Sequence, residues 1–168
     1  MKALMPGSFD PCTLGHLDLI ERTAGEYGEV TVAVFINPEK RGLFSYPDRV
    51  RFLRLATAHL ANVKVAFCDG MVADYAKDGG FSAIVKGVRN AADRAYEEAM
   101  AAYNLDRGGV ATVLLPTGEG LSDVSSTAVR SALREGRSLL GLVPEKAAEA
   151  MTEAYKNMEK SLAETREP

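Results

Sequence analysis

Twelve residues near the start of the chain, MPGSFDPCTLGH from Met5 to His16, gather groups that could bind phosphate. They follow a short apolar run and lead into a helical pattern, so they connect a strand to a helix. The first turn of a helix has free N–H groups and the positive end of the helix dipole, which together suit an anion. Gly15 lets a ligand approach the backbone, and His16 could reach the same anion. A Gly-His pair in a turn is more often structural, but its place after the first strand favours an anion site.

Cations and hydroxyl groups follow three other predicted strands. Lys40 with Arg41 follows the second strand, Lys86–Arg89 is expected in the loop after the fourth, and Ser122–Thr127 follows the fifth and enters a helix. Each group alone is typical of a solvated charge or an ordinary helix cap. Because the carboxyl ends of parallel strands meet at one edge of a sheet, we expect them to converge on one crevice.

Such a crevice suits a polyphosphate and a reaction that needs alignment more than a strong base. A phosphate monoester is already a nucleophile, so an enzyme that joins it to a nucleoside triphosphate must mainly orient both and neutralise charge. The chain has no Gly-x-Gly-x-x-Gly after its first strand and no P-loop sequence, which argues against a dinucleotide dehydrogenase and a P-loop kinase.

Alternating strand and helix patterns must position these groups. They predict an α/β fold: a single-domain, Rossmann-like, doubly wound, five-stranded parallel sheet over 1–168 with a C-terminal helix. We expect 165–168 to fray. Strands are predicted at 3–5, 30–36, 63–67, 82–85 and 110–115. In chain order, helices are predicted from residue 17, across 50–60, at 71–77, at 93–105, at 125–134 and from residue 144.

The composition is that of a soluble protein of the cytoplasm. The 168 residues carry a net charge of −3, so no global basic field attracts nucleic acid. The apolar runs are too short to span a membrane, and the N-terminal pattern, which goes straight into a predicted strand, leads us to expect no signal segment. Cys12 and Cys68 match no metal spacing and are expected to be small buried hydrophobes, and His59 is expected to matter for stability only.

The loop sequence resembles a known superfamily. Gly7–Pro11 followed by Thr13–His16 resembles the signature of nucleotidyltransferases with a (His/Thr)-x-Gly-His motif, and threonine at the first position is similar to the phosphopantetheine adenylyltransferase family. Two further segments extend the resemblance over nearly the whole chain. They are Lys86–Arg89 with Asp93, Tyr96, Glu97 and Asn104, and Val124–Thr127.

The resemblance implies an activity and a site. The family joins ATP to 4′-phosphopantetheine, releases pyrophosphate and 3′-dephospho-coenzyme A, uses Mg²⁺ that arrives with ATP, and is usually a homohexamer. The implied catalytic residues are His16 and Lys40, and no metal ligand is implied. The implied ATP-binding residues are Ser8, Phe9, His16, Gly87, Val88, Arg89, Glu97, Leu121, Ser122, Asp123, Val124, Ser125, Ser126 and Thr127, and the implied acceptor-binding residues are Ser8, Lys40, Met71 and Lys86.

The chain departs from the family pattern at three places. Lys86 stands where the family has arginine, which keeps the charge and loses the bidentate fork. Arg94-Ala95 replaces an aromatic-acidic pair, and 120–123 replaces an aromatic-containing stretch, so the adenine contacts are less certain than the phosphate contacts.

Two alternatives stay open. One is a transferase with another acceptor, such as nicotinamide mononucleotide or glycerol phosphate, against which Thr13 argues. The other is a non-catalytic nucleotide-binding module, against which the joint presence of Ser8, His16, Lys40 and Arg89 argues.

Overall fold

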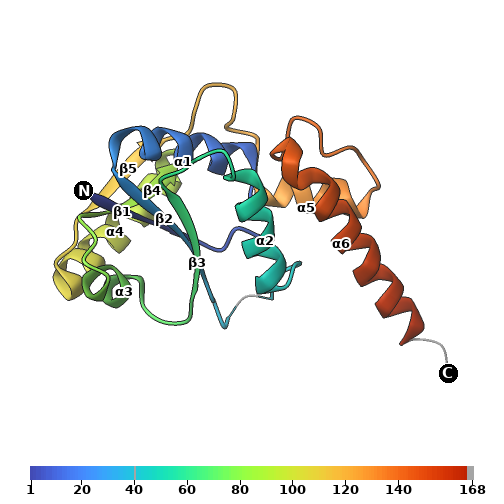
Figure 1. The fold of residues 1–168 in the computed structure, drawn as a ribbon, viewed down its shortest axis with the longest axis horizontal. Coiled ribbons are helices and arrows are strands. Elements are labelled where there is room, and N and C mark those ends of the chain that lie inside the picture. The colour runs from blue at the N-terminus through green and yellow to red at the C-terminus, as the bar shows by residue number, and fades with distance from the viewer. Residues whose placement is uncertain (40, 166–168) are drawn as a thin grey trace.

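Five parallel strands form one sheet in this computed structural model, which describes residues 1–39 and 41–165 (Figure 1). The chain starts in the centre of the sheet, runs outward on one side, and then crosses back to the other side. The point at which the direction reverses lies between the first and fourth strands, where open α/β sheets bind ligands. The strands are β1 (Lys2–Gly7), β2 (Glu29–Phe35), β3 (Val63–Cys68), β4 (Ala83–Val88) and β5 (Thr112–Pro116), in the order β3-β2-β1-β4-β5.

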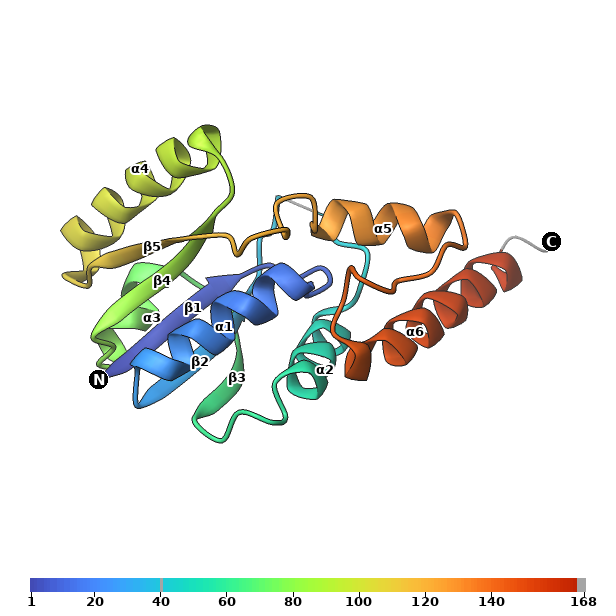
Figure 2. The same cartoon turned by 90° about the horizontal axis from the view of Figure 1, so that it is seen from above.

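Helices cover both faces of the sheet, which confirms the predicted doubly wound α/β fold. One face carries α1 (Leu14–Glu26) and α2 (Tyr46–Ala56), and the opposite face carries α3 (Val72–Asp78) and α4 (Ala91–Gly108) (Figures 1 and 2). Right-handed crossovers between parallel strands require this division, because the direction of travel along the sheet reverses after β3.

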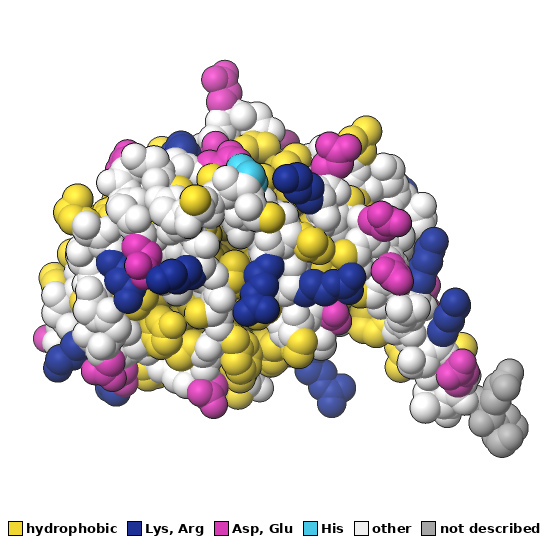
Figure 3. Space-filling view, in the orientation of Figure 1, with side chains coloured by type: hydrophobic (Ala, Val, Ile, Leu, Met, Phe, Trp, Pro, Cys, Tyr) yellow, Lys and Arg dark blue, Asp and Glu magenta, His cyan; other side chains and the backbone are white. Residues whose placement is uncertain are grey.

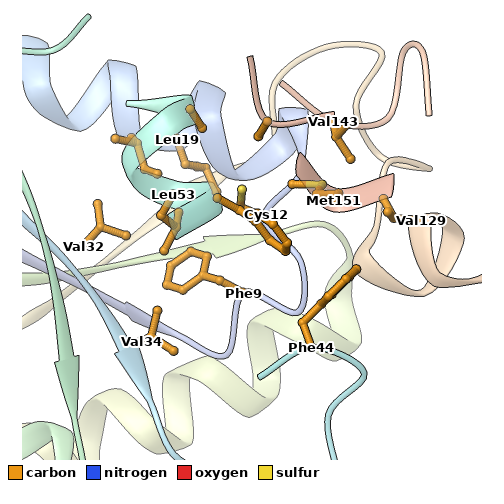
Figure 4. Close-up of a cluster of buried hydrophobic side chains, with 14 of the residues drawn as sticks. Phe9, Cys12, Leu19, Val32, Val34, Phe44, Leu53, Val129, Val143 and Met151 are labelled. Carbon is orange, nitrogen blue, oxygen red and sulfur yellow. The ribbon is translucent and has the colours of Figure 1, made fainter. Parts of the chain in front are cut away.

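Alternation along the central strands fills a core on each face. Met5 and Val32 point into the cluster beneath α1 and α2, where they meet Leu53, while Leu4 and Ala33 point into the smaller cluster beneath α3. Strands that are buried on both faces consist of nearly continuous apolar residues, as β2 does. Figure 4 shows the larger cluster, in which Phe9 and Cys12 from the loop after β1 lie among these side chains.

Two more helices follow the sheet: α5 (Ser126–Arg134) and α6 (Glu145–Glu164). Val129 and Met151 bring them into the larger core cluster, so the start of α6 packs beside α2 while its far end extends away from the sheet (Figures 2 and 4). Thr165 is the C-cap of α6, and its N–H donates to the Ser161 carbonyl. The fraying expected from residue 165 stays a prediction. The prediction for 166–168 lies outside the described residues.

Several predicted boundaries were wrong. The helix predicted across 50–60 is α2, which ends at Ala56, with the Thr57 N–H bonded to the Leu53 carbonyl as its C-cap. β4 continues through Lys86, Gly87 and Val88, which were predicted in the loop, because β5 pairs with them as far as Pro116. α4 starts at Ala91 rather than Asp93, because the Asn90 side chain caps it. β5 begins two residues later than predicted, at Thr112.

Along 1–39 and 41–165, every helix is too short or too polar to cross a lipid bilayer.

Candidate active site

A cavity of about 530 Å³ lies at the carboxyl ends of β1 and β4, where the sheet changes direction. Its walls come from the loop between β1 and α1, the end of β4, the first turns of α4 and the start of α5. The predicted convergence of strand-end groups is therefore present for three of the four groups. The fourth group includes Lys40, which lies outside the described residues.

The loop between β1 and α1 holds His16 in one orientation. Thr13 caps α1: its Oγ1 accepts a hydrogen bond from the His16 backbone N–H at 3.3 Å, and its own N–H donates to Nδ1 of the His16 ring at 3.0 Å. Because Nδ1 accepts this bond, the neutral ring carries its proton on Nε2. The Phe9 ring meets the imidazole edge-on with centroids 5.0 Å apart, which further limits its rotation. His16 is therefore a fixed N–H donor in the cavity wall.

The surroundings of His16 keep its ring neutral. The pKa of His16 is lowered from 6.5 to about 4, mainly by burial and in smaller part by the positive charges of Lys86 and Arg89. At neutral pH the ring therefore offers a hydrogen bond without a positive charge.

Two cations at the end of β4 are held by α4. Lys86 Nζ lies 3.2 Å from Glu97 Oε1, and Arg89 Nε lies 2.9 Å from Asp93 Oδ2. The hydrogen bond from Arg89 lowers the pKa of Asp93 below its usual value. Asp93 and Glu97 are four residues apart and so lie on one face of α4. These two cations are thus already placed, each next to a carboxylate.

The start of α5 is tied to the loop after β1. Ser125 is the N-cap, with its Oγ accepting from the Ala128 N–H at 3.1 Å, and Ser126 Oγ donates to the Pro11 carbonyl at 2.8 Å. Arg130 donates from Nη1 to the Asp10 carbonyl at 2.9 Å and from Nη2 to Thr127 Oγ1 at 3.1 Å. Two helix N-termini, those of α1 and α5, therefore border the same cavity.

A buried ion pair fastens the other side of this loop. Asp10 accepts hydrogen bonds from the backbone N–H groups of Leu43 at 2.7 Å and Phe44 at 2.9 Å, and its Oδ1 lies 3.2 Å from Arg49 Nε. Arg49 also donates to the Ser8 carbonyl at 3.3 Å and lies over the Tyr46 ring. The loop is thus held to the segment that enters α2. In the sequence, the first residue of this segment that contacts the loop, Leu43, follows Lys40 by three positions.

Most of the predicted site residues line the cavity. They are Ser8, Phe9, His16, Lys86, Gly87, Arg89, Glu97, Val124, Ser125, Ser126 and Thr127. Five predicted residues do not: Val88 is buried in the core, the Met71 side chain is exposed at the start of α3, and Leu121, Ser122 and Asp123 form the turn outside the rim.

Sequence reasoning missed two contributors to the site, Arg130 and the Asp10–Arg49 pair. Arg130 follows Thr127 by three residues on a helix. This spacing puts both on the same side of the helix, so the sequence could have predicted that Arg130 lies beside Thr127. No local pattern joins Asp10 to Arg49, because the contact depends on how α2 packs. Thr13 was noted only for its place in the motif, and the structure adds that it orients the His16 ring.

This arrangement suits charge stabilisation on a polyphosphate. A fixed neutral N–H donor, three cations (Lys86, Arg89 and Arg130) and two helix N-termini border one space, as a reaction at phosphorus requires. The thiol of Cys12 is close in sequence but buried, and burial raises its pKa to about 12, so it stays protonated in the core.

Several known proteins resemble this chain in sequence or in fold. The cytidylyltransferase-like family model matches residues 4–132. A phosphopantetheine adenylyltransferase from Corynebacterium glutamicum is 46% identical over 158 residues, covering 94% of this chain and 99% of that protein. One from Symbiobacterium thermophilum is 45% identical over 157 residues, covering 92% and 96%. A crystal structure of a protein provisionally assigned as a nicotinate-nucleotide adenylyltransferase from Vibrio parahaemolyticus superposes with a TM-score of 0.63 at 20% identity, covering 89% of this chain and 96% of that one, and shares the fold.

Proposed function

The chain belongs to the cytidylyltransferase-like family and to the phosphopantetheine adenylyltransferases, and from this we propose that its cavity transfers the adenylyl group of ATP to 4′-phosphopantetheine. The bond that forms joins an oxygen of the acceptor's phosphate to the α-phosphorus of ATP. The bond that breaks joins the α-phosphorus to the β-phosphate oxygen, and pyrophosphate leaves. The other product is 3′-dephospho-coenzyme A.

One observation carries the proposal: His16, whose Nδ1 is bonded to Thr13 and whose ring is neutral, lines a cavity that Lys86, Arg89 and the N-terminus of α5 also border. A neutral donor that Thr13 already holds in place can bond to the α-phosphate and grow stronger as charge develops there. It needs no reorganisation at the moment of reaction, and it gives up no proton.

The other roles divide between the two ligands. We assign the acceptor's phosphate to Lys86, and the β- and γ-phosphates of ATP to the start of α5 with Arg89 nearby. Because the attacking phosphate is already charged at neutral pH, alignment supplies much of the rate, of the order of 7–11 kcal/mol for well-oriented reactants. Lys40 is proposed to neutralise charge on the phosphates in flight, on the strength of the family resemblance alone.

Magnesium is proposed to enter with ATP. Mg²⁺ prefers phosphate oxygens and water to a cage of protein ligands. Within 1–39 and 41–165, no three His, Cys, Asp or Glu side chains are grouped to hold a metal, so the ligands in this proposal are phosphate oxygens and water. When bound, the ion would neutralise charge on the triphosphate.

The family resemblance also supports two wider proposals. We propose that the chain assembles as a homohexamer, which sedimentation equilibrium would test. We further propose that it works in the cytoplasm, where a free thiol such as Cys68 stays reduced.

A pyrophosphate-release assay tests the function directly. The purified protein is given ATP or CTP with a panel of acceptors: 4′-phosphopantetheine, nicotinamide mononucleotide and glycerol phosphate. Release with ATP and 4′-phosphopantetheine alone is the expected result. Release with another acceptor, or with CTP in preference to ATP, would overturn the assignment of substrates.

A further inference from the structure

One side of α1 runs along the loop 117–125, which joins β5 to α5 (Figure 1). Gly15, Asp18 and Arg22 lie on that side, because positions three and four apart share one face of a helix. Gly15 directly precedes His16, the donor proposed for the α-phosphate. The same helix therefore carries this donor and a series of contacts to a loop whose two ends line the cavity.

The start of this loop is held by an ion pair on α1. Arg22 Nη2 donates to the carbonyl of Pro116, the last residue of β5, at 2.7 Å, and to Asp18 Oδ2 at 2.8 Å. Arg22 Nε donates to the same carboxylate oxygen at 3.1 Å, so the guanidinium is held in one orientation. Thr117, the next residue of the chain, donates from its N–H to the Val88 carbonyl at 2.9 Å. The chain thus leaves β5 at a point that both α1 and β4 fix.

Two further contacts bring the loop against α1. A Cβ atom on Gly118 would lie only 2.7 Å from Asp18 Oδ2, so the bare backbone packs against this carboxylate. Because Arg22 holds the carboxylate, Asp18 cannot turn aside without breaking the ion pair. Near the end of the loop, the Val124 carbonyl oxygen lies 3.5 Å from the position that a Cβ on Gly15 would take. The loop therefore runs along α1 back toward the N-terminus of that helix.

We propose that Asp18 and Arg22 are positioning residues, which hold the loop 117–125 to α1 and thereby fix the start of α5 relative to His16. The proposal rests on the proposed function, which places the α-phosphate of ATP at His16 and its β- and γ-phosphates at α5. Since these phosphates belong to one molecule, the two sites must keep a constant separation. A shift of the loop should therefore harm ATP binding and transfer more than it harms the acceptor, whose phosphate is assigned to Lys86 on β4.

Arg22→Met tests the ion pair, because it removes the donors and keeps most of the length of the side chain. The pair is about a third exposed, at 38% for Arg22 and 30% for Asp18, so its loss should lower stability little and the variant should fold. Arg22→Lys keeps the charge and one donor for the Pro116 carbonyl. Arg137→Met is the control, since Arg137 pairs with Glu135 on the surface after α5 and lies outside the cavity wall.

Calorimetry gives the dissociation constant for ATP with Mg²⁺, steady-state kinetics gives kcat and both KM values, and thermal unfolding shows that each variant is folded. We expect Arg22→Met to lower kcat/KM for ATP about 10–10²-fold, as a small displacement of a reactant does, with little change in KM for 4′-phosphopantetheine. The dissociation constant for ATP should rise as well. Arg22→Lys should recover part of both losses, and Arg137→Met should match wild type.

Gly118→Ala tests the same arrangement without removing a polar group. The added methyl collides with Asp18, so ATP binding should again weaken more than acceptor binding. In an Asp18→Ala background the methyl has room, and Gly118→Ala should then cause a much smaller further loss, which a double-mutant cycle measures. Gly25→Ala, on α1 where an added Cβ meets open space, is the control and should change neither KM.

Two results would overturn the proposal. One is ATP affinity and kcat that stay unchanged in Arg22→Met and Gly118→Ala, even with some loss of thermal stability. The other is an equal rise of both KM values, which would show a general loosening of the cavity. Either result in an active wild-type enzyme would leave the proposed function intact. A wild-type protein that binds ATP but releases no pyrophosphate with 4′-phosphopantetheine would refute that function, and the dissociation constants for ATP would still decide the role of Asp18 and Arg22.

Discussion

Asp10 and Arg49 form a buried ion pair, with Oδ1 3.2 Å from Nε, that joins the loop between β1 and α1 to the segment that enters α2. The Arg49 side chain is 5% exposed and the Asp10 side chain 11%, so the two charges depend on each other and on the surrounding backbone. The pair thereby holds one wall of the cavity, because Arg49 also donates to the Ser8 carbonyl.

Arg49→Met should destabilise the protein strongly, by about 3–5 kcal/mol, because it leaves the Asp10 carboxylate buried without its cation. Urea unfolding measures this loss. Arg107→Met is the control, since Arg107 makes a close pair with Asp74 on the surface and its loss should change the free energy of unfolding little. Equal effects of the two substitutions would show that the Asp10–Arg49 pair contributes no more than a surface pair.

His16→Ala should fold and lose most of its turnover. Removing one preorganised donor to developing charge typically lowers the rate about 10²–10³-fold, or roughly 2.7–4 kcal/mol. Steady-state kinetics gives the loss, and circular dichroism shows that the fold is kept. His59→Ala is the control, because His59 meets only Glu21 at the surface, 2.7 Å away, and should turn over normally. Near wild-type turnover of His16→Ala would remove this side chain from the mechanism.

The lowered pKa of His16 predicts how stability varies with pH. The unfolded chain takes up this proton near pH 6.5, whereas the folded chain holds its ring neutral until about pH 4. Between these values the unfolded state binds more protons, so the stability that depends on the neutral ring is lost as the pH falls. Urea midpoints measured from about pH 7 to about pH 5 should decline less steeply for His16→Ala than for wild type. Parallel declines would contradict the assignment.

Two hydroxyl groups at the start of α5 should separate into a cap and a ligand contact. Ser125→Ala should cost about 0.5–2 kcal/mol of stability, as loss of an N-cap does. Ser126→Ala should raise KM for ATP more than KM for 4′-phosphopantetheine. Ser45→Ala, which removes the N-cap of α2 away from the cavity, is the control and should lower stability without changing either KM. If Ser126→Ala lost stability and kept its affinity for ATP, its hydroxyl would serve only to bond the Pro11 carbonyl.

Lys86 should act on the acceptor more than on ATP. Lys86→Ala is expected to raise KM for 4′-phosphopantetheine sharply, with a smaller effect on ATP. Lys86→Arg should preserve or lower that KM, because a guanidinium can bond two phosphate oxygens at once and β4 holds the position rigidly. Kinetics with each substrate varied in turn makes the comparison. An alanine variant with an unchanged dependence on the acceptor would end the assignment.

Local patterns were sufficient for the architecture of this protein. The apolar runs of β1 and β2 and the helical spacing after them predicted a doubly wound parallel sheet, because hydrophobic period reports which sides of an element are buried. The loop from Gly7 to His16 could likewise be placed at a strand end, because glycines, prolines and an N-cap residue influence the backbone conformation of only their near neighbours in sequence. Those local rules were enough to locate the cavity.

Only the tertiary structure decided how the cavity is held and charged. Lys86 was predicted in a loop but lies in β4, because pairing with β5 extends that strand. Asp10 meets Arg49, and Gly42 is needed beside them because the Arg49 guanidinium fills the space that a Cβ would take. Lys86 meets Glu97 only once α4 has packed against the sheet. These contacts join segments far apart in the chain, and no periodicity records them, because they depend on three-dimensional packing rather than on the preferences of neighbouring residues.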